Sequence, residues 1–241
     1  MCTLSWLPRP AGYTIYFNRD ERLSREPGLP PEVHADGTTP YIAPIDGDFG
    51  GTWIGVNRHG VTSCLLNRYD DTPYDPGPAR VSRGLLLTEL LELASPAAVA
   101  ERLDGSDLSR YAPFTIGVAA RDSPLTLFDW NGQAIARSGA QAAGPVRTSS
   151  GRDQAEAERM RALTWESMRA VESEVTDALL LRLHRSHAPV QGPFSVCMHR
   201  EEAATRSLTV VTVDRRVARL DYYAGPPCVT TDRTTVALDL A

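Results

Sequence analysis

The stretch at residues 2–18 reads CTLSWLPRPAGYTIYFN. Two runs rich in aromatic and β-branched residues, at 2–7 and 13–18, flank the segment PRPAG at 8–12. Strand-forming runs on either side of a segment that contains Pro and Gly predict a β-hairpin. We therefore expect the chain to begin with two antiparallel strands.

Further strands and helices follow along the chain. We expect strands at 51–57, 61–67, 114–120, 125–130, 133–137, 194–198, 207–213 and 217–223, and helices at 82–103, 152–169 and 173–186. Consecutive strands are mostly joined by short turns, of which Asn131-Gly132 is the clearest, so the sheets are predicted to be antiparallel with helices on their outer faces. No internal repeat or change of composition divides the chain, so we expect an α+β protein with one domain over residues 1–241.

Two local features add detail to this prediction. Residues 22–50 carry Pro, Gly and Asp without periodicity, which predicts a long loop that forms a lid or a pocket wall with Asp46 and Asp48. Ser150 and Asp153 resemble the N-cap and the third residue of the helix that follows them.

The composition excludes several classes of function. The net charge of the 241-residue chain is −5, and all 25 basic residues are arginine, so no basic surface for nucleic acid and no Schiff-base lysine are expected. No segment has the roughly 20 apolar residues of a membrane span. The N-terminus lacks a secretory pattern, because Pro8 and Pro10 interrupt it, and we expect a cytoplasmic protein.

Metal and redox motifs are likewise not predicted. The four cysteines lie far apart and form no CxxC pair, so free thiols are expected in a reducing compartment. His184 and His187 are three residues apart near a predicted helix end but lack an evident third ligand, and we interpret them as surface histidines. His199, two residues after Cys197, is a minor candidate for a residue of the functional site.

Cys2 is the first candidate for catalysis. Removal of Met1, which a small second side chain permits, would place a thiol and a free α-amine on one residue. An α-amine has a pKa near 7.7–8.0 and can act as a base at neutral pH, and cysteine needs little activation as a nucleophile. The alternative, which position alone favours, is a small buried residue in a strand.

The tetrapeptide NRDE at 18–21 places four polar residues at the end of the second strand. In a hairpin, the end of the second strand lies beside the start of the first. Asn18, Arg19, Asp20 and Glu21 are therefore expected near Cys2, where a guanidinium and carboxylates can hold an ammonium or a thiolate. A plain, solvated strand end is the alternative.

Several segments together resemble the NRDE family, whose eukaryotic members are called transport and Golgi organisation protein 2. These segments are MCT at 1–3, NRDE at 18–21, GGTWIGVN at 50–57 and CMHREEAATRSLTVV at 197–211. That family in turn resembles N-terminal nucleophile (Ntn) hydrolases of the penicillin V acylase and bile salt hydrolase type. The resemblance implies a four-layer αββα sandwich of antiparallel sheets and a catalytic cysteine exposed by processing, at the position of Cys2.

The resemblance also implies residues around the nucleophile. These hydrolases carry an Arg and an Asp three residues apart on the second strand, a separation that Asn18 and Glu21 have in this chain, with Arg19 and Asp20 between them. We interpret Asp20 as the carboxylate that orients the Cys2 amine and Arg19 as the cation near the thiolate, and a β-bulge would change this register.

Two further residues follow from the resemblance. Asn67, at the end of GVTSCLLN, matches an asparagine that donates to the oxyanion, and Arg206 matches a late arginine that completes the site electrostatically. A second family asparagine is absent, because residues 146–160 read VRTSSGRDQAEAERM, and Ser149 is the nearest substitute.

Two functions are consistent with these residues. The first is an amidohydrolase or acyltransferase that forms a thioester on Cys2 and needs no cofactor. The second is a non-catalytic carrier that binds haem, acyl-CoA or lipid in the same pocket. In both cases the expected partner is a small amide, acyl or hydrophobic molecule.

Overall fold

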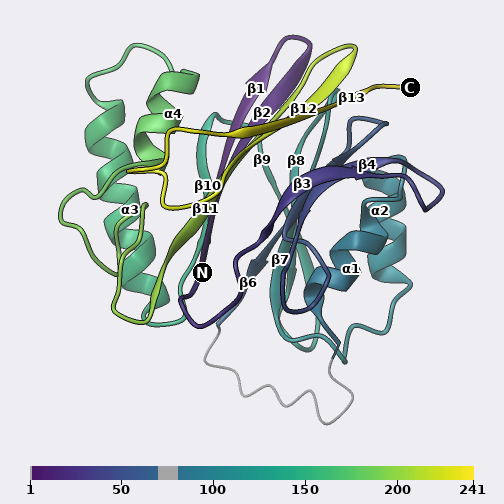
Figure 1. The fold of residues 1–241 in the computed structure, drawn as a ribbon, viewed down its shortest axis with the longest axis horizontal. Coiled ribbons are helices and arrows are strands. Elements are labelled where there is room, and N and C mark those ends of the chain that lie inside the picture. Colours follow the sequence, from purple (N-terminus) through teal and green to yellow (C-terminus); the bar gives the residue numbers. More distant parts are fainter. Residues whose placement is uncertain (1, 70–80) are drawn as a thin grey trace.

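Two antiparallel sheets stand face to face in the computed structural model, which describes residues 2–69 and 81–241 (Figure 1). Helices α3 and α4 cover the outer face of one sheet, and α1 and α2 cover the outer face of the other. The predicted four-layer αββα arrangement is therefore confirmed. The elements in chain order are β1 (Cys2–Arg9), β2 (Gly12–Arg22), β3 (Leu29–His34), β4 (Tyr41–Ile45), β5 (Ile54–Asn57), β6 (Thr62–Asn67), α1 (Arg83–Leu90), α2 (Pro96–Asp104), β7 (Phe114–Ala120), β8 (Ser123–Trp130), β9 (Ile135–Ala140), β10 (Gly144–Ser149), α3 (Gln154–Arg169), α4 (Asp177–His184), β11 (Ala203–Val213), β12 (Val217–Tyr223) and β13 (Thr234–Asp239).

The N-terminal hairpin lies in the middle of the first sheet, whose strand order is β10-β1-β2-β11-β12-β13. Strands β1 and β2 pair without interruption from Cys2↔Arg19 to Arg9↔Gly12, so the predicted hairpin is confirmed. The other edge of β1 pairs with β10, and the other edge of β2 pairs with β11. Segments from the start and the end of the chain thus lie side by side.

Alternation along β1 and β2 gives each of these strands two different faces. Leu4 and Trp6 of β1, with Ile15 of β2, point into the core between the sheets. Leu7 and Tyr16 point outward and pack under α4, in the apolar layer that contains Leu180. Every side chain near the start of β1 therefore faces either the second sheet or the helices.

The second sheet has the order β3-β4-β5-β6-β7-β8-β9. Its outer face is covered by leucines of α1 and α2 that pack on Phe114, Ile116 and Phe128. Strands β5 and β6 form the second predicted hairpin, which is confirmed. None of the helices in residues 2–69 and 81–241 is long and apolar enough to cross a membrane.

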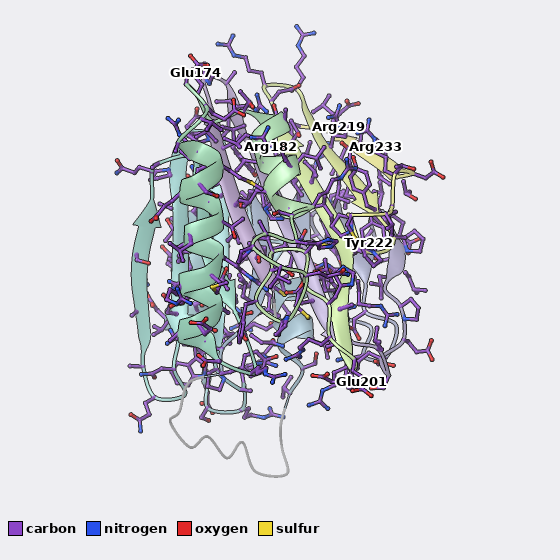
Figure 2. The ribbon with its side chains drawn as sticks, turned by 90° about the vertical axis from the view of Figure 1, so that its left-hand side faces the viewer. Glu174, Arg182, Glu201, Arg219, Tyr222 and Arg233 are labelled. Carbon is purple, nitrogen blue, oxygen red and sulfur yellow. The ribbon has the colours of Figure 1, made fainter. Side chains whose placement is uncertain are left out.

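Figure 2 views the molecule from the side on which α3 and α4 cover the first sheet. Glu174 and Arg182, labelled there, lie toward one end of α3 and α4, and Glu201 lies at the opposite end, just before β11 begins. Asp221 of β12 pairs with Arg219 and Arg233 at the side of this face.

Some predicted elements differ from the structure. The expected loop at 22–50 contains β3 and β4, and β3 tolerates Pro30 and Pro31 because it is an edge strand. The helix expected at 82–103 is two helices, because Ser95 caps a new helix with Pro96 at its first turn.

The strands and caps of the second half also depart from prediction. Strands β10 and β13 were not predicted, and residues 194–198 are irregular rather than extended in a sheet. Asp153, and not Ser150, is the N-cap of α3, since its side chain accepts a hydrogen bond from the Glu156 amide.

Candidate functional site

A cavity of about 460 Å³ opens at the end of the two sheets where β1 begins and β6 ends. Five of the candidate catalytic residues line it together: Cys2, Arg19, Asp20, Glu21 and Asn67. They come from β1, β2 and the end of β6, so the hairpin and the facing sheet assemble the cavity.

Cys2 is the first residue of β1 and pairs with two strands at once. It lies opposite Arg19 of β2 and opposite Ser149 of β10. Residues directly opposite in an antiparallel pair place their side chains on the same face, so both neighbours share the face of the thiol. Cys2 itself is 6% exposed.

The Arg19 side chain contacts aromatic and acidic side chains. Its guanidinium lies 4.4 Å from the centroid of the Trp53 ring and donates a 2.8 Å hydrogen bond to Asp46. Asp46 also accepts a 2.6 Å bond from Arg25, which is paired with Glu21 as well. The Arg19 side chain is thereby fixed on the Cys2 side of β2.

The segment GGTW forms the adjoining wall. A Cβ atom on Gly51 would lie 2.4 Å from the main chain of Gly84, and the Thr52 amide donates to the Gly84 carbonyl. Only glycine permits this approach of the two backbones. The start of GGTW is therefore packed closely against the first turn of α1.

Asp20 projects from the opposite face of β2, toward the helices. Its carboxylate accepts a 2.6 Å hydrogen bond from Thr205 and pairs with Arg161 of α3 at 3.3 Å. Both partners of the ion pair are almost fully buried, so each charge requires the other.

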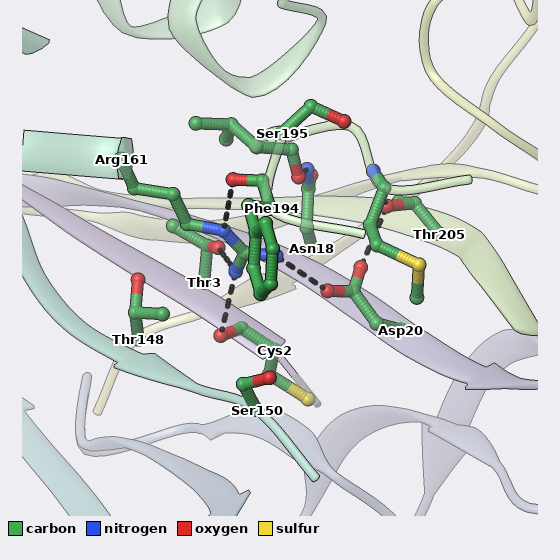
Figure 3. A network of polar contacts seen from close by, with 12 residues as sticks. Cys2, Thr3, Asn18, Asp20, Thr148, Ser150, Arg161, Phe194, Ser195 and Thr205 are labelled. Carbon is green, nitrogen blue, oxygen red and sulfur yellow. Dashed lines mark hydrogen bonds and ion pairs between the residues drawn. The ribbon is translucent and has the colours of Figure 1, made fainter. Parts of the chain in front are cut away.

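Arg161 links this ion pair to the backbone of the candidate nucleophile (Figure 3). Its guanidinium donates to the Cys2 carbonyl at 3.5 Å, to the Thr3 hydroxyl at 2.5 Å and to the Phe194 carbonyl at 3.4 Å. Arg161 of α3, which is distant in sequence, therefore holds the start of β1 on the side of the sheet that faces the helices.

Asn18 does not reach the cavity. It is buried on the helix side of β2, where its amide donates to the carbonyls of His184 and Val196 and its oxygen contacts His184 Nδ1 at 3.0 Å. Alternation along β2 turns Asn18 away from Arg19.

His184 is also placed differently from the expectation. It is the last residue of α4 but is fully buried, with Nε2 2.8 Å from the Ser5 hydroxyl, so the prediction of a surface histidine is wrong. Burial, and to a smaller extent the charge of nearby Arg161, lower the pKa of His184 to about 3.

Arg206 lies outside the residues that line the cavity. The pairing of β11 with β2 shifts register between Thr205 and Ser207, so Arg206 is the extra residue of a bulge. Its guanidinium donates to the carbonyls of Arg22 and Leu23. The bulge therefore directs Arg206 to the end of β2 instead of toward Cys2.

The surroundings of Cys2 act on its thiol in opposite directions. Burial raises the pKa of the Cys2 thiol above its ordinary value, Asp20 raises it further, and the Asp20 amide and Arg19 lower it. The thiol is therefore protonated at neutral pH and requires a base to become a nucleophile.

Two hydrogen-bond donors lie near Cys2, one at the cavity wall on Asn67 and one opposite Cys2 in β10 on Ser149. Asn67 Nδ2 makes a 3.3 Å hydrogen bond to the Tyr69 hydroxyl at the cavity wall. The Ser149 hydroxyl is buried and has no hydrogen-bond partner within residues 2–69 and 81–241. A buried hydroxyl without an acceptor is a donor available to a bound oxygen.

The cavity offers little to a metal or haem iron. Among its described lining residues Cys2 is the single one with a sulfur or imidazole donor, and the other polar side chains carry carboxylates, guanidiniums, hydroxyls, an indole and an amide. A haem bound there would have one protonated thiol as its axial ligand.

The sequence did not indicate that Arg161 contacts the start of β1. It also did not indicate that Trp53 and Asp46 contact Arg19. Arg161 lies in a helix segment whose other charges face solvent, so its pattern does not distinguish it. Asp46 was expected at a pocket wall, and that placement is confirmed, but its bond to Arg19 depends on the fold of β4.

The comparison with family models matches residues 1–223 to the family described as Transport and Golgi organisation 2. The chain belongs to this family. The match covers β1 to β12, and so includes every residue of the cavity described above. No curated protein sequence matches the chain significantly.

Solved structures of Ntn hydrolases share the fold of this Transport and Golgi organisation 2 family member. Penicillin V acylase from Agrobacterium tumefaciens is similar over 99% of this chain and 86% of its own, with a TM-score of 0.60 and 10% identity. A mutant of the conjugated bile acid hydrolase from Clostridium perfringens covers 99% and 92%, with a TM-score of 0.59 and 10% identity.

A third similar structure is the Caenorhabditis elegans N-acylethanolamine-hydrolyzing acid amidase orthologue. It matches 99% of this chain and 100% of its own, with a TM-score of 0.64 and 12% identity. At these identities the likeness establishes a common Ntn-hydrolase-like fold and leaves the reaction to be argued from this chain's own residues.

Proposed function

We propose that this protein is a cysteine-type Ntn amidohydrolase or acyltransferase that forms a thioester on Cys2 after removal of Met1. The observation that carries the proposal is the position of Cys2, which begins a central strand at a cavity, opposite Arg19 and with its carbonyl bonded to Arg161. Met1 lies outside the described residues, so its removal is part of the proposal. The fold shared with three amide-hydrolysing proteins supports it.

The reaction begins with proton transfer from the thiol to the free α-amine of Cys2. The thiolate sulfur attacks the carbonyl carbon of an amide, and the C=O electron pair moves onto the oxygen. When the tetrahedral intermediate collapses, the C–N bond breaks and the leaving amine takes the proton from the α-ammonium. Water then attacks the thioester carbonyl and gives a proton to the α-amine; the C–S bond breaks, the acid leaves, and the α-ammonium returns the proton to the Cys2 sulfur. In an acyltransferase an amine or alcohol attacks in place of water, and the product that leaves is an amide or an ester.

The oxyanion needs hydrogen-bond donors near Cys2. Asn67 Nδ2 supplies the first, and the Ser149 hydroxyl, which is unpartnered and lies in register with Cys2, supplies the second. A donor of this kind contributes about 3 kcal/mol to the transition state. Ser149 thus takes the part that the absent family asparagine has in the predicted scheme.

The protein's own mass provides the first test. We expect the purified full chain to lack Met1 and to gain one acyl group on Cys2 when it is mixed with a panel of acyl amides and acyl-CoA thioesters and quenched rapidly. Peptide mapping by mass spectrometry locates the adduct. Cys2→Ala is expected to lose both the adduct and turnover, by about a million-fold or to background.

Cys64→Ala is the matched control for this experiment. Cys64 is a second fully buried cysteine of the same core, and burial raises the pKa of its thiol to about 12, but it does not line the cavity. Its variant should retain adduct and turnover. An intact mass that includes Met1, or equal turnover in Cys2→Ala, would falsify the proposal.

The carrier function is the alternative, and one observation favours it. The Cys2 thiol is protonated by burial, and Trp53, Phe49 and Leu65 give the same cavity an apolar wall. A carrier retains acyl-CoA or lipid on purification, or shows a Soret band with added haem, and its Cys2→Ala variant binds as well as the wild type.

A further inference from the structure

Two cysteines and two histidines converge on the helix side of the first sheet, outside the cavity. His187, Cys197 and His199 belong to the irregular segment 185–202 between α4 and β11, and Cys228 belongs to the loop after β12. One nitrogen or sulfur atom from each residue lies within 4.8 Å of the corresponding atom of the other three. Two loops that are separate in sequence therefore meet at four metal-binding side chains.

The separations have the size of a tetrahedral site. His199 Nε2 lies 3.6 Å from Cys197 Sγ and 3.5 Å from Cys228 Sγ. With Zn–S bonds of about 2.3 Å and Zn–N bonds of about 2.0–2.1 Å, two ligands at the tetrahedral angle are about 3.6 Å apart. Both thiols are free, so neither sulfur is used in a disulfide.

His187 completes the group with an unused nitrogen. Its ring lies edge-on to that of His199, with the centroids 5.0 Å apart. Its Nε2 atom is buried and has no hydrogen-bond partner among the residues that the structure describes. A buried polar atom without a partner is costly, and a bound cation would satisfy it.

The four side chains are of the types that bind a metal after losing their protons. Cysteine binds zinc as the thiolate and histidine binds it as the neutral imidazole, so binding at this cluster would release the thiol protons.

We propose that His187, Cys197, His199 and Cys228 form a tetrahedral zinc site. Two thiolates and two imidazoles are a donor set that suits Zn²⁺. Because all four positions are filled by the protein, the site is structural and leaves no position for substrate. The spacing of these residues in the sequence matches no zinc-finger pattern, so they could be found only once the chain was folded.

The site would stabilise the segment that supports the back of the Cys2 cavity. The Met198 amide, between the two ligands Cys197 and His199, donates to the Thr205 hydroxyl, and this hydroxyl donates to Asp20. The carbonyl of Phe194 in the same segment accepts from Arg161 (Figure 3). A metal that ties residues 185–202 to the loop after β12 therefore fixes both members of the buried ion pair.

Metal analysis of the full-length, tag-free protein tests this proposal. We expect about one zinc ion per chain by inductively coupled plasma mass spectrometry after purification with reductant and without chelator. Replacing zinc by Co²⁺ is expected to give the visible bands of tetrahedral cobalt and a thiolate charge-transfer band. Chelation is expected to lower the unfolding temperature by several degrees.

Variants separate specific from adventitious binding. Cys197→Ser combined with Cys228→Ser should remove the zinc ion and the cobalt spectrum. The controls Cys64→Ser and His59→Ala change a cysteine and a histidine outside the cluster and should retain both. If the double variant does not fold, the cobalt spectrum and chelator response of the wild type still decide the question.

Three results would overturn the zinc site. The first is wild-type protein with far less than one zinc ion per chain and no tetrahedral cobalt spectrum. The second is an equal zinc content in wild type and double variant. The third is a Cys197–Cys228 disulfide in protein purified with reductant, which would assign the two thiols to a redox pair.

Discussion

The cavity around Cys2 and the cluster around Cys197 place cysteine in two contrasting settings. Cys2 is a single thiol at a cavity that is also lined by charged side chains. Cys197 and Cys228 lie close to two imidazoles, with one sulfur or nitrogen atom of each residue within 4.8 Å of the others. The surroundings, and not the residue, decide between a nucleophile and a metal ligand.

The two regions are joined by a short chain of buried polar contacts. Asp20 accepts from Thr205 on the cluster side, and Arg161 bonds both to Asp20 and to the Cys2 carbonyl. Substitutions in one region, or in the contacts that connect the two regions, can therefore test how far the two regions depend on one another.

Removing Arg161 is expected to have the largest effect on stability, because both regions share it. Arg161→Met leaves the Asp20 carboxylate buried without its cation, and breaking such a pair costs about 3–5 kcal/mol. Urea unfolding curves measure the loss.

Arg159→Met is the control for this change, since Arg159 lies two residues earlier in α3 and pairs with Glu156 in solvent. Its unfolding midpoint should match that of the wild type. Equal midpoints for the two variants would mean that Arg161 does not join the regions.

Removing the Asn67 amide is expected to disturb the cavity alone. If Asn67 donates to the oxyanion, Asn67→Ala lowers kcat by about 10²–10³, or about 3 kcal/mol, while the zinc content stays at that of the wild type. Steady-state kinetics on a substrate from the acyl panel, together with metal analysis, measure both quantities.

Asn131→Ala, in the turn between β8 and β9, is the matched asparagine control and should leave kcat unchanged. A fall in zinc content for Asn67→Ala would contradict the separation of the two regions.

A change of one pH unit is expected to have the smallest effect on the free energy of unfolding. The group responsible is the buried His184. Its pKa is about 3 in the folded protein and near 6.5 in the unfolded chain, so the unfolded state takes up a proton first as pH falls. The contribution of neutral His184 is complete above pH 6.5 and is lost toward pH 3, by at most about 1.4 kcal/mol per pH unit.

Urea unfolding between pH 7 and 5, with chelator present so that metal release does not contribute, measures this slope. His184→Gln should flatten it, and the exposed His59→Gln should not. A wild-type slope that persists in His184→Gln would assign the dependence to other groups.

Local patterns in the sequence predicted the elements that are neighbours along the chain. The hairpin at 2–18, the hairpin at 51–67 and antiparallel sheets with helices on their outer faces could be recognised from alternation and turns. The four-layer αββα arrangement came from the family resemblance. The start of β1 and the NRDE segment gave four of the residues that line the cavity: Cys2, Arg19, Asp20 and Glu21. Asn67, the fifth, came from the family resemblance.

The remaining features depend on contacts between distant segments. The pairing of β1 with β10 brings Ser149 to Cys2, and the packing of α3 brings Arg161 there. The bulge at Arg206 appears only when β11 pairs with β2. None of these contacts has a local signature, because each depends on the sheet as a whole.

The central position of β1 in its sheet has a consequence for synthesis. Cys2 lies in a strand that pairs with β2 on one side and with β10 on the other. The other edge of β2 can pair only after β11, which begins at Ala203, has been synthesised. At roughly 5–20 residues per second, a ribosome takes on the order of tens of seconds to supply these later strands. During that interval the N-terminus is accessible to an aminopeptidase, so the removal of Met1 that we propose would take place on the nascent chain, before the sheet is complete.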